Sequence, residues 1–528
     1  MKNYIKVAFT CGMMGAAFSG CDSYLDTMPD NRATLDSEEK VRTILTSSYI
    51  DHVYSLVAEL SSDNVDSYGM QNPNGTRFLD DAHAWKDEIE SNNESLERFW
   101  SSSYIAISSA NEALKAIDEL GGPEASNTLK ACRGEALVSR AYNHFMLANM
   151  FCWRYDKDAA SHLGLPYMVK PETSLNPQYE RGNLKDFYDK IQTDIEEGLP
   201  LISDDLYNVP KYHFNVKAAW ALATRFYLYT EQWEKAVDAA TNVVGSSPKA
   251  MLRDYKGMSE MTQNITAITN EYINPASNAN LLLHTNYSIL GMIFGNYSTY
   301  SRYSHGAYVS ENEDICATNI WGGKTMFWQG VKSYRATNGV RDVFWKMPNL
   351  FEYTDINAGT GYRHSVVVAF STDEALLNRA EAYIMLGRYD EAAADLTTFM
   401  QNITKSTMVL TPENIAEFYN EQSYCYEDEN KMLSGLKKHL NPAFAIDTEG
   451  SIQECMLQCV LGFRRIETIH AGLRWFDIKR YGIEIPRRVI DLTEKPSERT
   501  DWLSKDDPRR AMQVPLKVRD AGFEPNPR

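Results

Sequence analysis

The sequence has few residues that could cross-link the chain or bind a metal ion. Its 528 residues include eight cysteines and ten histidines, and neither type is clustered. Cys11 and Cys21 lie near the start, and the other six cysteines are scattered over residues 132–459. This spacing predicts no dense disulfide framework. Cys455 and Cys459 lie one helical turn apart and could ligate zinc, but no paired His/Cys set accompanies them. We expect them to be buried small hydrophobes.

Positive charge and long apolar runs are also scarce. The formal net charge is −18. Such an acidic chain lacks the Lys/Arg density that neutralises phosphate groups, so nucleic acid is not expected as a partner. The apolar run over residues 7–18 is shorter than the roughly 20 residues that a membrane-spanning helix needs. No other run is long enough, so we expect no spanning helix.

The first 21 residues contain the parts of a bacterial export signal. Lys2 and Lys6 precede the apolar run, and small residues follow it at Ser19 and Gly20. The tetrapeptide Phe-Ser-Gly-Cys at 18–21 resembles the lipobox of bacterial lipoproteins, in which the cysteine becomes the acylated first residue. A plain signal peptide with a chance cysteine is the alternative. We expect residues 1–20 to be removed and Cys21 to be lipidated, so that the membrane is contacted through the lipid anchor only.

Familiar catalytic motifs are missing, including Gly-x-Ser-x-Gly and His-Glu-x-x-His. Acidic pairs such as Asp63 and Asp66 could supply the two carboxylates of a glycosidase, set roughly 5 to 10 Å apart. Acidic loops are nevertheless common in a chain of this charge. Residues 311–319, "ENEDICATN", could bind calcium, but they lack the glycine and terminal glutamate of an EF-hand loop. We expect a solvated acidic turn there, and we predict no catalytic residue, metal or other cofactor, with structural calcium as the alternative.

Helical periodicity dominates the first half of the chain. Apolar stripes run through 41–60, 100–117 and 184–199, the last after a predicted N-cap at Asn183. Two segments, 217–240 and 370–396, share small and aromatic residues at spacings of 8, 6 and 3. These residues are Ala219, Tyr227, Trp233 and Ala236 in the first segment, and Ala375, Tyr383, Tyr389 and Ala392 in the second. The pattern is typical of tetratricopeptide helix pairs, and Ser371 with Glu374 predicts a capping box at the start of the second copy.

These helices are expected to form a scaffold that supports irregular insertions. The predicted fold is mainly α with minor β structure, in a single domain over residues 21–528. The scaffold covers mainly 38–60, 98–245, 371–400 and 452–482. The insertions, about 61–98 and 250–365, are rich in Asn, Ser, Gly and Tyr, and such insertions are where binding usually occurs.

Tyrosine rings interspersed with Ser, Asn and Gly are typical of adaptable binding loops, similar in composition to an antibody paratope. The candidate ligand-binding residues are Tyr68, Arg77, Trp85, Tyr297, Tyr300, Tyr303, Trp321 and Trp328. The alternative for any one ring is packing onto the helices.

Several segments in order resemble one known family. They include "CDSYLDTMP" at 21–29, "GEALVSRAYNHFML" at 134–147, "DEALLNRAEAYIMLGRYDEAAADL" at 373–396 and "GLRWFDIKRYG" at 472–482. Together they resemble the SusD/RagB family of surface glycan-binding lipoproteins. In "RWFDIKR", Arg474 and Asp477 can pair one turn apart with Trp475 and Phe476 packed inward, which indicates a structural motif.

The resemblance implies a SusD-like α-helical fold with tetratricopeptide-like helix pairs. It also implies a glycan ligand, and a SusC-like TonB-dependent outer-membrane transporter as partner. The expected protein is anchored in the outer membrane, exposed at the cell surface, and not an enzyme. A RagB-like protein that binds peptides or glycopeptides is one alternative, and a glycan-cleaving lipoprotein is another.

Overall fold

The computed structural model describes residues 34–172, 177–295, 297–336 and 339–528, so the predicted signal and Cys21 lie outside the described residues. The described helices are α2 (Glu38–Leu45), α3 (Ser55–Ser61), α4 (Arg77–His83), α5 (Leu96–Glu119), α6 (Asn127–Phe151), α7 (Leu184–Gly198), α8 (Val216–Tyr229), α9 (Trp233–Val244), α10 (Tyr255–Glu260), α11 (Ile265–Tyr272), α12 (Leu290–Ile293), α13 (Ala307–Glu313), α14 (Thr372–Met385), α15 (Tyr389–Ile403), α16 (Pro412–Asn420), α17 (Ile452–Glu467), α18 (Leu473–Arg480) and α19 (Leu516–Asp520). The mainly α fold predicted from the periodicity is confirmed.

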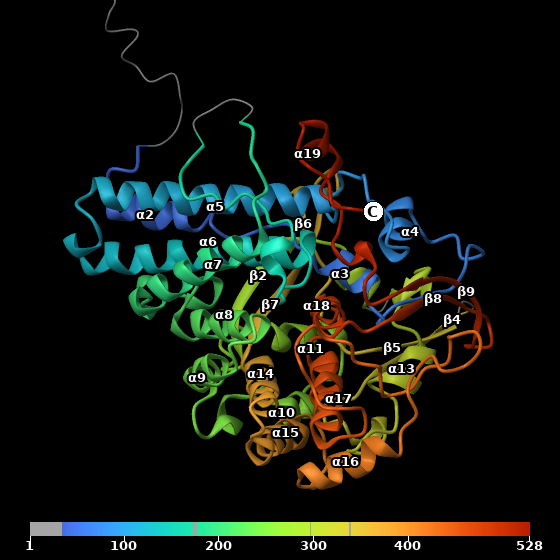
Figure 1. The fold of residues 1–528 in the computed structure, drawn as a ribbon. Helices are drawn as coiled ribbons and strands as arrows, with labels where there is room; N and C mark the ends of the chain where they lie inside the picture. Colours follow the sequence, from blue (N-terminus) through green and yellow to red (C-terminus); the bar gives the residue numbers. More distant parts are fainter. Residues whose placement is uncertain (1–33, 173–176, 296, 337–338) are drawn as a thin grey trace, which may run out of the picture.

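Most of the long helices pack in a continuous series (Figure 1). Helices α5, α6, α7, α8 and α9 contact one another in chain order, and α9 then packs against α14, which packs against α15 and α17. The predicted repeat segments are thus the helix pairs α8/α9 and α14/α15, which lie side by side although they are far apart in sequence. Their small residues Ala219, Ala236, Ala375 and Ala392 are fully or almost fully buried. Small side chains there let the helices approach closely.

Buried arginine–carboxylate pairs connect neighbouring helices. Each pair makes two hydrogen bonds of 2.6–2.8 Å. The pairs are Arg140–Asp194 between α6 and α7, Arg225–Glu374 between α8 and α14, and Arg379–Asp395 between α14 and α15. An unpaired buried charge costs several kcal/mol, so these pairs fix the relative positions of the helices.

Two local predictions need correction. The stripe over 41–60 is divided between α2 and α3, because Ser48 bonds back to the carbonyl of Leu45 and its own carbonyl accepts from Asn143 of α6. The Ser371 hydroxyl does cap α14 by accepting from the Glu374 amide at 3.1 Å. The Glu374 carboxylate, however, does not complete a capping box, since it binds Arg225 instead.

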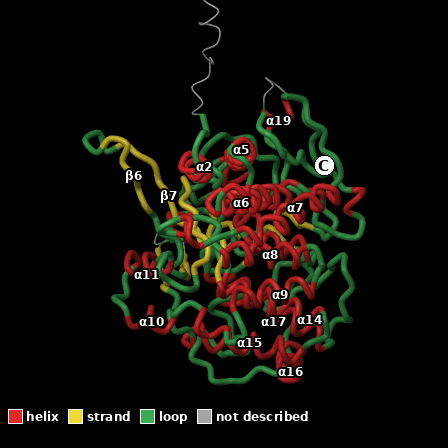
Figure 2. Tube along the Cα trace, turned by 90° about the vertical axis from the view of Figure 1, so that its left-hand side faces the viewer, coloured by secondary structure: helices red, strands yellow, loops and turns green. Residues whose placement is uncertain are grey.

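The strands form three small sheets beside the helices. They are β1 (Asp66–Ser67), β2 (Asn280–Tyr287), β3 (Tyr303–Ser304), β4 (Lys332–Ala336), β5 (Gly339–Val343), β6 (Leu350–Asp355), β7 (Thr360–Ser371), β8 (Ile485–Ile490) and β9 (Pro496–Leu503). Their orders are β3-β1-β8-β9, β2-β7-β6 and β4-β5. Figure 2 shows the β6–β7 hairpin extending away from the body of the molecule. Most of this β structure lies in the second insertion.

Candidate functional site

The two predicted insertions meet at an open pocket of about 890 Å³. This volume lies at the upper end of the range for small-molecule sites, about 300–1,000 Å³. Its lining comes from residues 74–94 of the first insertion and residues 288–363 of the second. The lining residues are Asn74, Thr76, Phe78, Leu79, Asn92, Asn93, Glu94, Ser288, Ile289, Met292, Ile293, Tyr297, Tyr300, Ser301, Phe351, Gly361, Tyr362 and Arg363.

Hydrogen bonds to backbone carbonyl groups hold the two insertions together at the pocket. The amide of Arg302 donates to the carbonyl of Asn74 at 3.2 Å, and the side chain of Asn72 donates to the carbonyl of Ser301 at 3.2 Å. The Arg302 guanidinium bonds Asp80 of α4 at 2.6 Å and passes close to Gly75. A Cβ at Gly75 would lie 2.4 Å from Cζ of that guanidinium, so only glycine fits without a shift.

Two of the predicted tyrosines face this pocket. Tyr297 and Tyr300 are 51% and 58% exposed, and both belong to the lining. They flank a short turn in which the amide of Tyr300 donates to the carbonyl of Tyr297 at 3.0 Å. Exposed aromatic rings of this kind offer flat apolar faces to a ligand, with a hydroxyl at the tip.

Glu94 is the single carboxylate among the described lining residues. It is buried, and it accepts hydrogen bonds from the amide of Ile289 and from the Ser288 hydroxyl. Burial raises the pKa of Glu94 to about 7, and the hydrogen bonds from Ile289 and Ser288 only partly offset this rise. Glu94 therefore joins the first insertion to the start of α12 and supports one wall of the pocket.

Four predicted ligand residues, Tyr68, Trp85, Tyr303 and Trp321, are buried and lie outside the lining of this pocket. Tyr68 donates to Glu494 and lies under the Arg341 guanidinium, 3.3 Å from the ring centre. Trp85 donates to the carbonyl of Ser61 at 2.9 Å. Tyr303 donates to Asp80 at 2.7 Å.

The fourth, Trp321, packs against the rings of Phe327 and Phe463. All four rings stabilise the insertions because each is packed against other segments of the chain.

The remaining two predicted residues lie outside the lining. Arg77 is exposed at the start of α4, 3.5 Å from Asp81 and 3.6 Å from Glu90. Trp328 is half-buried, with the ammonium groups of Lys256 and Lys405 5.7 and 5.9 Å from its ring centre. Neither side chain reaches the lining of the pocket.

The sequence predictions missed the contribution of the β6–β7 hairpin. Phe351, Tyr362 and Arg363 belong to the lining, as do Asn92 and Asn93 of the first insertion. The strands are separated by "INAG" at 356–359, and small polar turns between aromatic runs are a hairpin signature. That signature was available in the sequence, but which side the hairpin faces depends on its pairing with β2.

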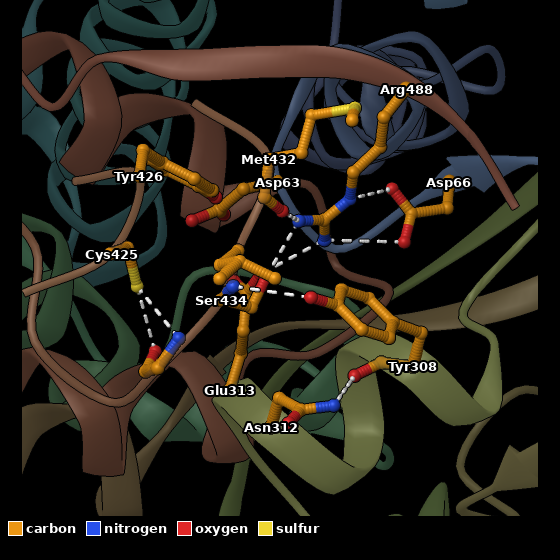
Figure 3. Close-up of polar contacts among 12 residues, drawn as sticks. Asp63, Asp66, Tyr308, Asn312, Glu313, Cys425, Tyr426, Met432, Ser434 and Arg488 are labelled. Carbon is orange, nitrogen blue, oxygen red and sulfur yellow. Dashed lines mark hydrogen bonds and ion pairs between the residues drawn. The ribbon is translucent and has the colours of Figure 1, made fainter. Parts of the chain in front are cut away.

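A buried ionic network fixes both insertions to the C-terminal part of the chain, and Figure 3 shows the part of it around Arg488. Four carboxylates face four cations there: Asp63, Asp66, Glu313 and Asp314 face Lys438, Arg465, Arg474 and Arg488. Arg488 of β8 bonds Asp66 at 2.8 Å and the Ser434 hydroxyl at 2.6 Å. The network thus connects segments from five regions of the sequence.

The network corrects two further expectations. Glu313 and Asp314 do not form a solvated turn, because both are buried and ion-paired. Burial raises the pKa of Glu313, but Lys438 and Arg465 outweigh burial and leave that pKa well below its ordinary value. In "RWFDIKR", Trp475 and Phe476 are buried as predicted.

The predicted ion pair within that motif is wrong. Arg474 bonds Asp63 through two contacts of 2.8 Å. Asp477 instead bonds Arg464 through two contacts of 2.9 Å. These two partners come from outside the motif, because the tertiary fold brings acids and bases of distant segments close together. Within the motif, Asp477 makes a longer contact of 3.4 Å with Arg480.

The six cysteines in the described part of the chain are free. Cys455 and Cys459 are fully buried, as expected for small hydrophobic residues. Within the same ranges, no helix combines the length and the apolar character needed to cross a bilayer.

The fold and the pocket define a helical-repeat protein with an open, aromatic-lined site on its insertions. Residues 23–228 match the model of a SusD-like family described as "Starch-binding associating with outer membrane". No curated protein sequence matches the chain. Solved structures of SusD superfamily proteins do match it over nearly its whole length.

A SusD superfamily protein from Bacteroides thetaiotaomicron is 18% identical, with a TM-score of 0.62 over 94% of this chain and 100% of the other. One from Bacteroides vulgatus is also 18% identical, with a TM-score of 0.60 over 94% and 99%. A SusD-like carbohydrate binding protein from Bacteroides vulgatus is 14% identical, with a TM-score of 0.56 over 92% and 96%. Residues 23–228 are thus similar to a SusD-like family, and the chain has the SusD-like fold over nearly its whole length, in agreement with the resemblance found in its sequence.

Proposed function

We propose that this protein is a cell-surface lipoprotein that binds glycans in the pocket between its two insertions. It would pass the glycan to a SusC-like TonB-dependent transporter in the outer membrane. The proposal rests on the types of residue that line the pocket. Half-exposed rings of Tyr297 and Tyr300 stand there beside neutral polar groups such as Asn74 and Asn92.

This combination matches the chemistry of sugars. The C–H faces of a pyranose pack on aromatic rings, and its hydroxyls bond amide and hydroxyl groups. The lining is also sparsely charged, with Arg363 and the buried Glu94 as its charged residues among those described. A neutral or weakly charged glycan therefore fits the pocket better than a strongly ionic ligand does.

The lining also favours binding without cleavage. A glycosidase of the usual kind needs two carboxylates on either side of the scissile bond. Glu94 is alone among the described lining residues and is occupied by bonds to Ser288 and Ile289. The family description as starch-binding, and a similar protein named as carbohydrate binding, agree with a binding role.

The location rests on the N-terminal sequence and on the family. The family is described as associating with the outer membrane, and the tetrapeptide that ends at Cys21 resembles a lipobox. Lipid chains on Cys21 would hold the acidic body at the membrane without a spanning helix, since each buried methylene contributes about 0.8 kcal/mol. Transfer to a SusC-like transporter is what the family resemblance implies for a protein in this position.

Calorimetry on the detergent-solubilised full chain tests the proposal. The chain is titrated with starch, xylan, arabinan, galactan and mannan, and the mixtures are then analysed for released sugars. Tyr300→Ala removes one lining ring, and we expect it to weaken binding of the glycan that binds by about fivefold. Tyr212→Ala, which removes an exposed tyrosine outside the lining, is the control and should leave binding unchanged.

Each outcome decides between the candidate functions. Glycan binding that Tyr300→Ala weakens, with no sugar released, supports the proposal. Released oligosaccharide would identify a glycan-cleaving enzyme instead. Binding restricted to peptides in a parallel titration with a tryptic digest would identify a RagB-like peptide-binding protein.

A further inference from the structure

The β6–β7 hairpin exposes more aromatic surface than a surface hairpin requires. Five of the six residues of β6 are exposed, and the hairpin extends out of the body of the molecule (Figure 2). Phe351, Gly361, Tyr362 and Arg363 of the hairpin line the pocket. Phe351 is 40% exposed and Tyr353 is 56% exposed. Contiguous exposed apolar surface of this kind often marks a binding site.

The strand register places these rings on one face. Phe351 lies opposite Arg363, and Tyr353 lies opposite Gly361. Directly opposed residues of an antiparallel pair point to the same side of the sheet. The rings of Phe351 and Tyr353 contact each other edge to face, with centroids 4.8 Å apart. We call this set of four residues the hairpin strip.

Gly361 keeps the strip flat. A Cβ at this position would lie 2.9 Å from Cε1 of Phe351 and 2.0 Å from the carbonyl oxygen of Glu352. The Phe351 ring therefore extends over the glycine, across the hairpin. Any larger residue at Gly361 would displace the ring and break the continuous surface.

The hairpin strip is continuous with the pocket but longer than it. Phe351, Gly361 and Arg363 belong to the pocket lining, whereas Tyr353 lies outside it. Two residues of a strand span about 7 Å, so Tyr353 carries the aromatic surface that distance toward the hairpin tip. Arg363 adds a cation that bonds Asn349 at 3.1 Å and has further donors for ligand oxygens.

We propose that the hairpin strip is a second subsite for a glycan chain that continues out of the pocket. The ligand is then an extended polymer, held at one point by the pocket and at another by the Tyr353 ring. Short fragments that fill only the pocket gain nothing from Tyr353. This inference rests on the proposed function and adds to it a preference for long chains.

Binding as a function of ligand length tests the strip. The probes are the polysaccharide from the panel that binds the full chain most tightly and a ladder of oligosaccharides made from it by partial acid hydrolysis. Wild-type affinity should rise along the ladder. Tyr353→Ala should weaken polymer binding about fivefold and leave the shortest bound fragments within twofold of wild type. Ile356→Ala removes an exposed apolar residue at the hairpin tip and should change neither.

Three results would overturn the subsite. The first is that Tyr353→Ala weakens the binding of short and long ligands equally. The second is that Tyr353→Ala leaves polymer binding unchanged. The third is that Tyr353→Ala leaves polymer binding intact but reduces the amount of transporter that co-purifies with the protein. The last would make the strip a protein contact. If wild type binds no glycan of the panel, the proposed function fails first. If wild type binds and the length dependence survives Tyr353→Ala, only the subsite fails.

Discussion

Replacing Glu313 with glutamine should destabilise the protein, because the Glu313 carboxylate accepts hydrogen bonds from three cations of the buried ionic network. Its carboxylate lies 2.7 Å from Nζ of Lys438, 2.9 Å from Arg465 and 3.0 Å from Arg488. Glutamine keeps the shape and one acceptor oxygen but removes the charge. Three carboxylates, those of Asp63, Asp66 and Asp314, would then face four cations.

The magnitude follows from the burial of the site. Removing one partner from a buried ion pair costs about 3–5 kcal/mol, because the other charge is left without compensation. At about 2.1 cal/mol/K per residue, a chain of 528 residues has an unfolding entropy on the order of 1 kcal/mol/K. A loss of about 4 kcal/mol therefore lowers the melting temperature by about 4 °C if the chain unfolds as one unit.

Differential scanning fluorimetry at pH 7.5 measures this shift. Glu311→Gln is the matched control, since Glu311 lies on the same helix α13 but is exposed. It should shift the melting temperature by less than about 1 °C, because surface substitutions usually change stability by about 0.5 kcal/mol or less. If Glu313→Gln has the same melting temperature as the Glu311→Gln control, the conclusion that this carboxylate balances the buried cations is refuted.

The pH dependence gives a second test of the same reasoning. The pKa of Glu313 is lowered in the folded protein, so its stabilising contribution is present above the ordinary glutamate pKa. That contribution is lost as the pH falls below about 4.3 and Glu313 takes up a proton. The difference in melting temperature between wild type and Glu313→Gln should therefore shrink on acidification. A difference that stays constant to pH 3 would contradict the assignment.

Two further predictions concern the pocket wall and the anchor. Burial raises the pKa of Glu94 to about 7, so its share of stability is complete below about pH 4.3 and is lost as the pH rises through about 7. In urea unfolding, the free energy of unfolding of wild type should fall by an amount on the order of 3 kcal/mol between pH 5 and pH 8, and Glu94→Gln should not show this fall. Identical pH profiles of the two proteins would contradict this. Cys21→Ala should move the protein from the membrane fraction to the soluble fraction of lysed cells, and a protein that stays membrane-bound would show that the anchor prediction is wrong.

The helical scaffold was predictable because its information is local. The spacing of Ala219, Tyr227, Trp233 and Ala236 predicts a helix pair on its own, and the structure has α8 and α9 there. The N-cap at Asn183 was equally readable, since its side chain accepts from the amide of Asp186 three residues on. Such features depend on neighbours within one or two helical turns.

The site was only partly predictable because exposure is not a local property. Tyr300 and Tyr303 are three residues apart in one tyrosine-rich segment, yet Tyr300 is exposed and Tyr303 is buried against Asp80. Nothing in their immediate sequence separates them. The difference comes from α4, more than 200 residues earlier in the chain, which covers one ring and leaves the other in the pocket.

By itself the sequence determined the helices, the repeated pairs, the two insertions and the family they resemble, because periodicity and order can be read along the chain. Only the tertiary structure decided which rings face the pocket and which acids face which cations. Asp63 and Arg474 are about 400 positions apart, and their pairing at 2.8 Å exists only once the helices have packed. The hairpin strip depends in the same way on the register of β6 against β7. Pairings between distant segments are set by the fold as a whole, and no local pattern contains them.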